Sequence, residues 1–266
     1  MKYFVCTLLF LLCRASVDAQ TRTADIITSE GTMKVILYDD VPKHIQAFID
    51  RAQKGKFDGT LFTRVIKDFM IQGGSPDSKN APAGARIGYG DRFSEIMPEF
   101  KSHYFHKKGA LAAPRQNDDV NPQKKSDISQ FFIVQGKVYR PGELDTLEKA
   151  TNLPIRRKAM AEFYTPVKEE MERLKTEDVK TYNQHVVEIN SKVDSVIRAT
   201  PGHLIFTPEQ REAYTTIGGA HHLDGFYTIF GEVVEGFDVI DKIASQPKDS
   251  YDRPKKDIKI ISVRIR

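Results

Sequence analysis

Residues 62–74 read FTRVIKDFMIQGG, and this stretch decides the fold together with two shorter ones. Residues 129–133 read SQFFI, and residues 223–225 read LDG. The three segments supply a single arginine, glutamine side chains and a high density of Phe, Met and Leu. They offer no candidate nucleophile, metal-binding cluster or phosphate-binding loop. Such a set is typical of a reaction that needs an apolar pocket and one fixed cation but forms no covalent bond with the protein.

The composition of the chain is that of an ordinary soluble globular protein. It has 266 residues, of which 40% are hydrophobic and 29% are charged, and such values are common in this class. The net charge of +4 arises from 40 basic and 36 acidic residues scattered along the sequence. Because a nucleic-acid-binding protein concentrates its basic residues on one element, we expect no nucleic-acid partner.

The first residues differ from the rest and predict a signal peptide, residues 1–19. Lys2 gives a basic start, an apolar run follows over residues 3–13, and residues 17–19 offer small side chains for cleavage before Gln20. The run is too short to cross a bilayer as a helix. We therefore expect an exported protein, periplasmic or secreted, without an integral membrane segment after removal of the signal.

Both cysteines, Cys6 and Cys13, lie inside this signal segment. A chain that starts at Gln20 would therefore have no disulfide, no catalytic thiol and no zinc site built on cysteine. Lipidation of Cys13 is a weaker alternative, because Leu12 stands where lipoprotein signals carry a small residue.

Two hydrophobic patterns alternate after the predicted signal peptide. Within residues 20–136 and 219–266, short apolar runs separated by Gly, Pro, Asn and Asp occupy residues 60–136, 226–234 and 258–265, which is typical of strands in a barrel or sandwich. Residues 137–218 are helical in pattern, and their apolar residues from Val179 to Val196 recur at alternating steps of three and four. We therefore predict a helical insertion, 137–218, within a β-rich domain formed by the two flanking parts.

The three opening segments, in this order, resemble the core motifs of the cyclophilin family of peptidyl-prolyl cis–trans isomerases, with the third motif extending over residues 223–236 as LDGFYTIFGEVVEG. The resemblance covers about residues 23–136 and 219–266. It implies a mainly β fold, a closed eight-stranded antiparallel β-barrel capped by two helices, here with an inserted α-helical segment.

The resemblance matches Arg64 to the catalytic arginine of the family, and the chemistry of the X–Pro bond explains such a residue. Conjugation of the amide nitrogen gives a rotation barrier of about 18–20 kcal/mol. In the twisted transition state the nitrogen loses conjugation and becomes a hydrogen-bond acceptor. A fixed donor aimed at that nitrogen binds the twisted form better than the planar one. Arginine suits this role because it stays charged and has a rigid donor fork.

The resemblance also implies a set of substrate-binding residues. Adjacent strand residues point to opposite faces, so one of Phe131 and Phe132 is expected in the core and the other in the pocket. The resemblance assigns the pocket to Phe132. Pro114 departs from the family pattern because it removes a backbone N–H. The implied substrate-binding residues are Phe69, Met70, Gln72, Pro114, Arg115, Gln130, Phe132, His222, Leu223 and Tyr227.

The expected function is therefore acceleration of rotation about X–Pro bonds during the folding of exported proteins, whose proline-containing segments would be the partners. Catalysis would need no metal and no cofactor. One alternative is a chaperone or binding module in which residues 137–218 hold unfolded clients. Another is that this insertion mediates dimerisation.

Overall fold

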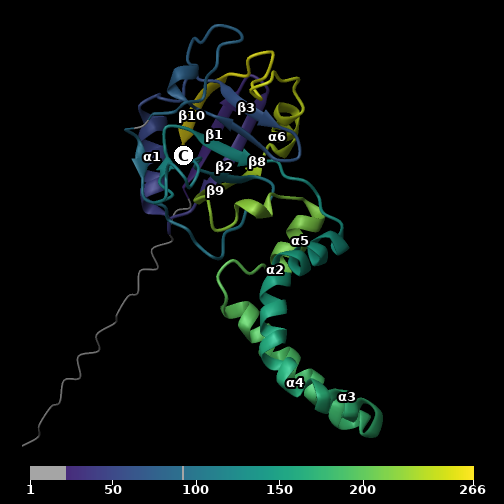
Figure 1. Ribbon diagram of the computed structural model, residues 1–266. Coiled ribbons are helices and arrows are strands. Elements are labelled where there is room, and N and C mark those ends of the chain that lie inside the picture. The colour runs from purple at the N-terminus through teal and green to yellow at the C-terminus, as the bar shows by residue number, and fades with distance from the viewer. Residues whose placement is uncertain (1–21, 92) are drawn as a thin grey trace, which may run out of the picture.

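The computed structural model describes residues 22–91 and 93–266, and its centre is an eight-stranded antiparallel sheet (Figure 1). A second, two-stranded sheet pairs β5 with β7. The signal peptide predicted for residues 1–19 lies outside the described residues. In spatial order the strands of the large sheet are β10 (Ile260–Ile265), β1 (Thr23–Thr28), β2 (Gly31–Leu37), β9 (Ile229–Glu235), β6 (Ala110–Ala112), β8 (Phe131–Val134), β4 (Met70–Gly73) and β3 (Phe62–Ile66), and those of the small sheet are β5 (Glu95–Ile96) and β7 (Ser126–Asp127).

The large sheet curls until its two edges meet. Leu61, just before β3, forms an antiparallel bridge with Lys259, just before β10. Backbone hydrogen bonds of 2.8 and 2.9 Å join residues 59–62 to residues 258–260 at the same place. The eight antiparallel strands are thus confirmed. The sequence predicts a closed barrel, whereas the structure has a strongly curled sheet. Its two edges touch over a few residues and do not pair along a full ladder.

The inner face of the sheet packs against two helices, α1 (Pro42–Gln53) and α6 (Phe237–Ala244). Helix α1 buries Ile45, Phe48 and Ile49 because their three- and four-residue spacing places them on one face. The ring of Phe48 meets that of Phe131 on β8 edge to face, with 5.9 Å between centroids. Since burying a Phe side chain contributes about 1.5–3 kcal/mol, these rings are strong stabilisers of the inner core.

The remaining α-helices form an arm, residues 141–216, that extends away from the sheet (Figure 1). Two short 3-10 helices, η1 (Pro76–Ser78) and η3 (His221–Leu223), lie outside the arm. Helices α2 (Pro141–Phe163), α3 (Lys168–Glu177) and α4 (Val179–Ala199) bury a small apolar core of their own, which includes Ala159, Met171 and Val193. No helix in the described part of the chain is long and apolar enough to cross a membrane. The helical elements of the arm are α2 (Pro141–Phe163), η2 (Thr165–Val167), α3 (Lys168–Glu177), α4 (Val179–Ala199) and α5 (Pro208–Thr216).

The arm joins the sheet at a neck formed by Lys137 and Gly219. These two residues exchange a pair of backbone hydrogen bonds, of 3.1 and 3.0 Å. A Cβ atom on Gly219 would lie 2.3 Å from the ring of Tyr214 and 2.5 Å from the carbonyl oxygen of His106. Non-bonded carbon atoms do not approach this closely, so only glycine lets the chain segments meet here.

We expect Gly219→Ala to destabilise the protein by about 1–3 kcal/mol, the usual cost of overpacking a filled interior. Gly142→Ala in the first turn of α2 is the matched control, because a Cβ there meets nothing within 4 Å and alanine favours a helix. Denaturant titration measures the free energy of unfolding of both variants. Equal stabilities would contradict the tight packing of the neck.

Candidate active site

One row of residues crosses five strands and brings very different side chains to one face of the sheet. Arg64 of β3 lies opposite Gln72 of β4, and Gln72 lies opposite Phe132 of β8. Phe132 also pairs with Ala112 of β6, which pairs with Ile229 of β9. Because directly opposite residues point to the same face, the sheet places a cation, an amide and an apolar surface side by side.

The alternation along β8 shows that this row lies on the outer face. Phe131 and Ile133 are buried in the inner core, whereas Phe132 and Val134 belong to a second, outer cluster. The prediction that Phe131 and Phe132 point to opposite faces is confirmed. We call this outer cluster the apolar patch, and the predicted site residues in it are Phe69, Met70, Phe132, Leu223 and Tyr227.

The apolar patch has a buried floor and a more open rim. Met70, Phe132 and Leu223 are 2%, 3% and 6% exposed, and Tyr227 is half-buried with its ring edge-on to Phe132 at 5.7 Å. The exposed ring of His222 lies beside Phe69 at the rim, with 5.2 Å between centroids. Partial burial lowers the pKa of His222. His222 is therefore mostly neutral at pH 7.

The other five predicted residues line a polar pocket of about 880 Å³, a size usual for ligand sites. The rest of its wall is formed by residues of the loop 116–125 and by Gly88, Tyr89, Asp91, Glu95 and Asp127. The structure therefore divides the predicted site into an apolar patch and a polar pocket. The predicted residues that line the pocket are Arg64, Gln72, Pro114, Arg115 and Gln130.

A chain of amides fixes the orientation of Gln72 in this pocket. Its Nε2 donates to Oε1 of Gln130 at 2.9 Å, and Nε2 of Gln130 donates to Oδ2 of Asp127 at 2.8 Å. A carboxylate can only accept hydrogen bonds, so Asp127 sets the direction of both amides. Gln130 thus supports Gln72 from the side.

Arg64 is held by a carboxylate and is otherwise open to the pocket. Its Nε donates to Oδ2 of Asp252 at 3.2 Å, and Oδ1 of Asp252 accepts from Nζ of Lys248 at 2.6 Å. Partial burial raises the pKa of Asp252, but the hydrogen bonds from Lys248 and Arg64 outweigh this and hold it below its ordinary value. Asp252 therefore stays charged at neutral pH and orients Arg64, whose side chain is 46% exposed.

Pro114 and Arg115 tie the pocket to the apolar patch. The carbonyl of Pro114 already accepts the backbone N–H of Asp127 at 2.8 Å. Nε of Arg115 donates to the carbonyl of Phe226 at 2.7 Å, and its guanidinium lies over the ring of Tyr227 at 4.9 Å. Arg115 thereby links the wall of the pocket to the rim of the patch.

Three residues that the sequence did not single out for the site lie behind the patch: His106, Tyr214 and Asp224. His106 is fully buried, and its ring is parallel to that of Phe132 at 6.0 Å. Burial lowers the pKa of His106, so its ring is neutral at pH 7. The tripeptide LDG marked the position of Asp224, but nothing in the local sequence marks Tyr214.

An apolar patch flanked by a fixed guanidinium and a peptide-sized pocket is the kind of site that a prolyl isomerase needs. A family model described as Cyclophilin type peptidyl-prolyl cis-trans isomerase/CLD matches residues 23–153 and 176–265. The chain belongs to this family and is a cyclophilin-type peptidyl-prolyl cis–trans isomerase.

The chain is also similar to bacterial proteins that are described as peptidyl-prolyl cis-trans isomerases. A "Putative peptidyl-prolyl cis-trans isomerase" of Staphylococcus haemolyticus is 29% identical over 238 residues, which are 89% of this chain and 87% of the relative. Its counterpart in Staphylococcus epidermidis is 27% identical over 237 residues, with the same coverage. A "Putative bifunctional phosphatase/peptidyl-prolyl cis-trans isomerase" of Streptococcus pyogenes is 26% identical over 245 residues, but this chain spans only 38% of its length.

Among solved structures, a cyclophilin type peptidyl-prolyl cis-trans isomerase of Cryptosporidium parvum shares the fold. Its TM-score is 0.52 at 18% sequence identity, and the match covers 92% of this chain and 98% of that chain. A second structure of that protein, in the presence of the dipeptide Ala-Pro, gives a TM-score of 0.51. The curled sheet described above is therefore the cyclophilin-like fold.

We expect Asp252→Asn to lower kcat/KM about tenfold with the fold intact, because Arg64 is the predicted catalytic residue and a misplacement by about 1 Å can cost up to a hundredfold. Asp25→Asn is the matched control, since Asp25 accepts from Nε of Arg266 at 2.9 Å on a strand away from the site. A peptide isomerisation assay measures both variants. Equal activity in the two would show that Asp252 does not orient Arg64.

Proposed function

We propose that this protein accelerates rotation about X–Pro bonds of exported proteins, and that Arg64 stabilises the twisted transition state. The observation that carries the proposal is the row of Arg64, Gln72 and Phe132 on three adjacent strands. It supports a substrate pose in which the proline ring rests on the apolar patch and the peptide backbone runs into the polar pocket.

Each part of the site has a distinct task in this mechanism. The apolar patch holds the proline ring and removes water from the amide, which strengthens electrostatic interactions there. Gln72, oriented by Gln130, binds the peptide backbone. Arg64 donates to the proline nitrogen as that nitrogen loses conjugation. A preference of roughly 7 kcal/mol for the twisted over the planar amide would accelerate exchange about 10⁵-fold.

The test is NMR exchange spectroscopy of an Ala-Pro peptide with the wild type and with Arg64→Ala. We expect strong acceleration by the wild type and a loss of at least about tenfold in the variant, as for removal of a transition-state donor. Arg64→Lys should recover little activity, because lysine lacks the planar fork. No acceleration by the folded wild type would refute the proposal.

The mechanism also predicts a nearly flat pH–rate profile between about pH 6.5 and 9. Arg64 does not titrate in this range. Asp252, whose pKa is lowered, stays charged, and His222, whose pKa is also lowered, takes up a proton only below its ordinary value of about 6.5. A bell-shaped profile within this window would instead indicate a titrating acid or base.

We further propose that the protein is exported, and that a signal peptidase removes residues 1–19. The basic start and the apolar run over residues 3–13 support this proposal. Amino-terminal sequencing of the protein from fractionated cells should find Gln20 first. Placing a charge in the apolar run with Leu9→Arg should keep the chain inside and uncleaved. A lipid on Cys13, or an intact Met1 in the exported fraction, would contradict cleavage at this position.

A further inference from the structure

Asp224 is the residue at which the apolar patch and the helical arm meet. Its Oδ1 accepts from the backbone N–H of His106 at 2.7 Å and is 2.9 Å from Nδ1 of the same residue. Its Oδ2 accepts from the hydroxyl of Tyr214 at 2.5 Å and from Nε2 of Gln210 at 3.4 Å. Hydrogen bonds to a carboxylate are stronger than those between neutral groups, so these donors fix the carboxylate from two sides.

On the sheet side, His106 connects Asp224 to the apolar patch. Because the buried ring is neutral and the carboxylate can only accept, Nδ1 is the protonated nitrogen and donates to Asp224. The ring then lies at 8° to that of Phe132 and edge-on to Tyr227. Leu223, directly before Asp224, belongs to the patch itself. A shift of Asp224 would therefore displace side chains at both the floor and the rim of the patch.

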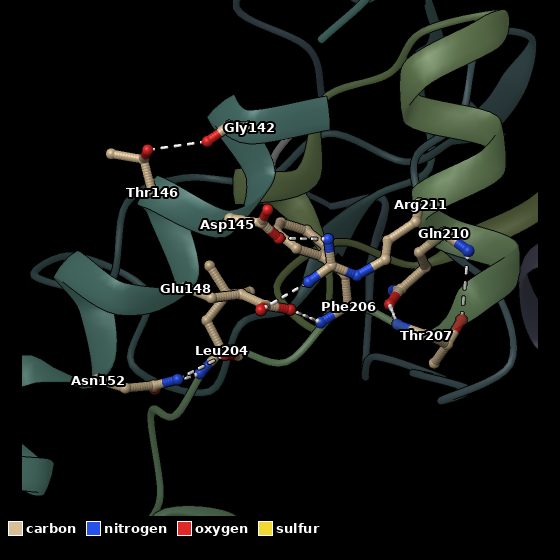
Figure 2. A network of polar contacts seen from close by, with 10 residues as sticks. All are labelled: Gly142, Asp145, Thr146, Glu148, Asn152, Leu204, Phe206, Thr207, Gln210 and Arg211. Carbon is tan, nitrogen blue, oxygen red and sulfur yellow. Dashed lines mark hydrogen bonds and ion pairs between the residues drawn. The ribbon is translucent and has the colours of Figure 1, made fainter. Parts of the chain in front are cut away.

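On the arm side, Tyr214 belongs to α5, and α5 is clamped onto α2. Arg211 of α5 binds Asp145 at 2.8 Å and Glu148 at 2.6 Å, both on α2 (Figure 2). The side chain of Tyr214 is fully buried. Burial and the neighbouring carboxylate raise its pKa, so the hydroxyl keeps its proton and donates at all physiological pH values.

Figure 2 shows that the clamp does not depend on one ion pair alone. Glu148 also accepts from the backbone N–H of Phe206 at 2.6 Å. Asn152 and Leu204 exchange two hydrogen bonds, of 2.7 and 2.9 Å, one turn further along α2. The segment that leads into α5 is thus bonded to α2 before the chain reaches Tyr214.

We propose that Tyr214 is a positioning residue for proline binding. Its hydroxyl holds Asp224, and Asp224 holds His106 and Leu223 in the places where they support the apolar patch. Without this hydroxyl, the long contact to Gln210 is all that Oδ2 keeps among the described residues, and the carboxylate gains freedom to rotate. The inference rests on the proposed function, since it takes the apolar patch as the seat of the proline ring.

The test compares Tyr214→Phe with Tyr139→Phe. Both variants remove one hydroxyl from the same aromatic cluster, but it is the Tyr214 hydroxyl that donates to Asp224. NMR line-shape analysis of an Ala-Pro peptide gives its dissociation constant and its exchange rate on the enzyme. For Tyr214→Phe we expect the dissociation constant to rise about three- to tenfold, with the bound exchange rate changed less than about twofold.

A merely structural role of Tyr214 would give a different result. It would lower the melting temperature and the folded fraction but leave the dissociation constant of the folded protein at the wild-type value. That outcome, or an equal rise for Tyr139→Phe, would overturn the proposal.

A double variant tests the route through Asp224. If Tyr214 acts through this carboxylate, Tyr214→Phe combined with Asp224→Asn should bind the peptide no more weakly than Asp224→Asn alone, because two residues on one route are not additive. Full additivity would overturn the proposal. Peptide binding by a wild type that does not accelerate exchange would count against the proposed function alone.

Discussion

The constraint on which this structure depends is the two-residue period of a strand, because the sheet uses both of its faces. On β8 the inner face takes Phe131 for the core and the outer face takes Phe132 for the apolar patch. A register slip of one residue would exchange these two rings and remove both the packing against α1 and the patch. On β3 the pairing shifts between Phe62 and Arg64, so that Phe62 remains in the core while Arg64 lies opposite Gln72. Stability and site are therefore set by the same pairing.

The polar side of the candidate site follows a second rule, that a carboxylate orients its donors, either directly or through a neighbouring amide. Asp252 orients Arg64, Asp127 orients Gln130 and through it Gln72, and Asp224 orients His106. A carboxylate accepts hydrogen bonds and never donates them, so each one removes an ambiguity in the direction of its partner. Preorganised donors cost little reorganisation during the reaction, which is the form of electrostatic catalysis that a rotation about a bond can use.

Much of the fold could be predicted from the sequence, because its signals are local. Alternating residues indicated strands, steps of three and four indicated the helices between residues 137 and 218, and adjacent Phe131 and Phe132 had to separate. The features that the sequence does not predict depend on contacts between distant segments. Asp252 lies 188 residues after Arg64, and Asp224 lies 118 residues after His106. Neither pairing has a periodicity or spacing that marks it. The extent of edge contact in the sheet and the bond to the Pro114 carbonyl were hidden for the same reason.

The neck at Lys137 and Gly219 affects how the length of the arm can change during evolution. Because the two ends of the arm are bonded to each other at the sheet, the fold of the sheet does not depend on the length of the outer part of the arm. The entropy of closing a loop grows slowly with length, and a doubling costs only about 0.6 kcal/mol. A gene could therefore lengthen, shorten or exchange the outer part of the arm while the barrel-like body went on folding as before. The segment around α5 is the exception, since it is part of the wall behind the site.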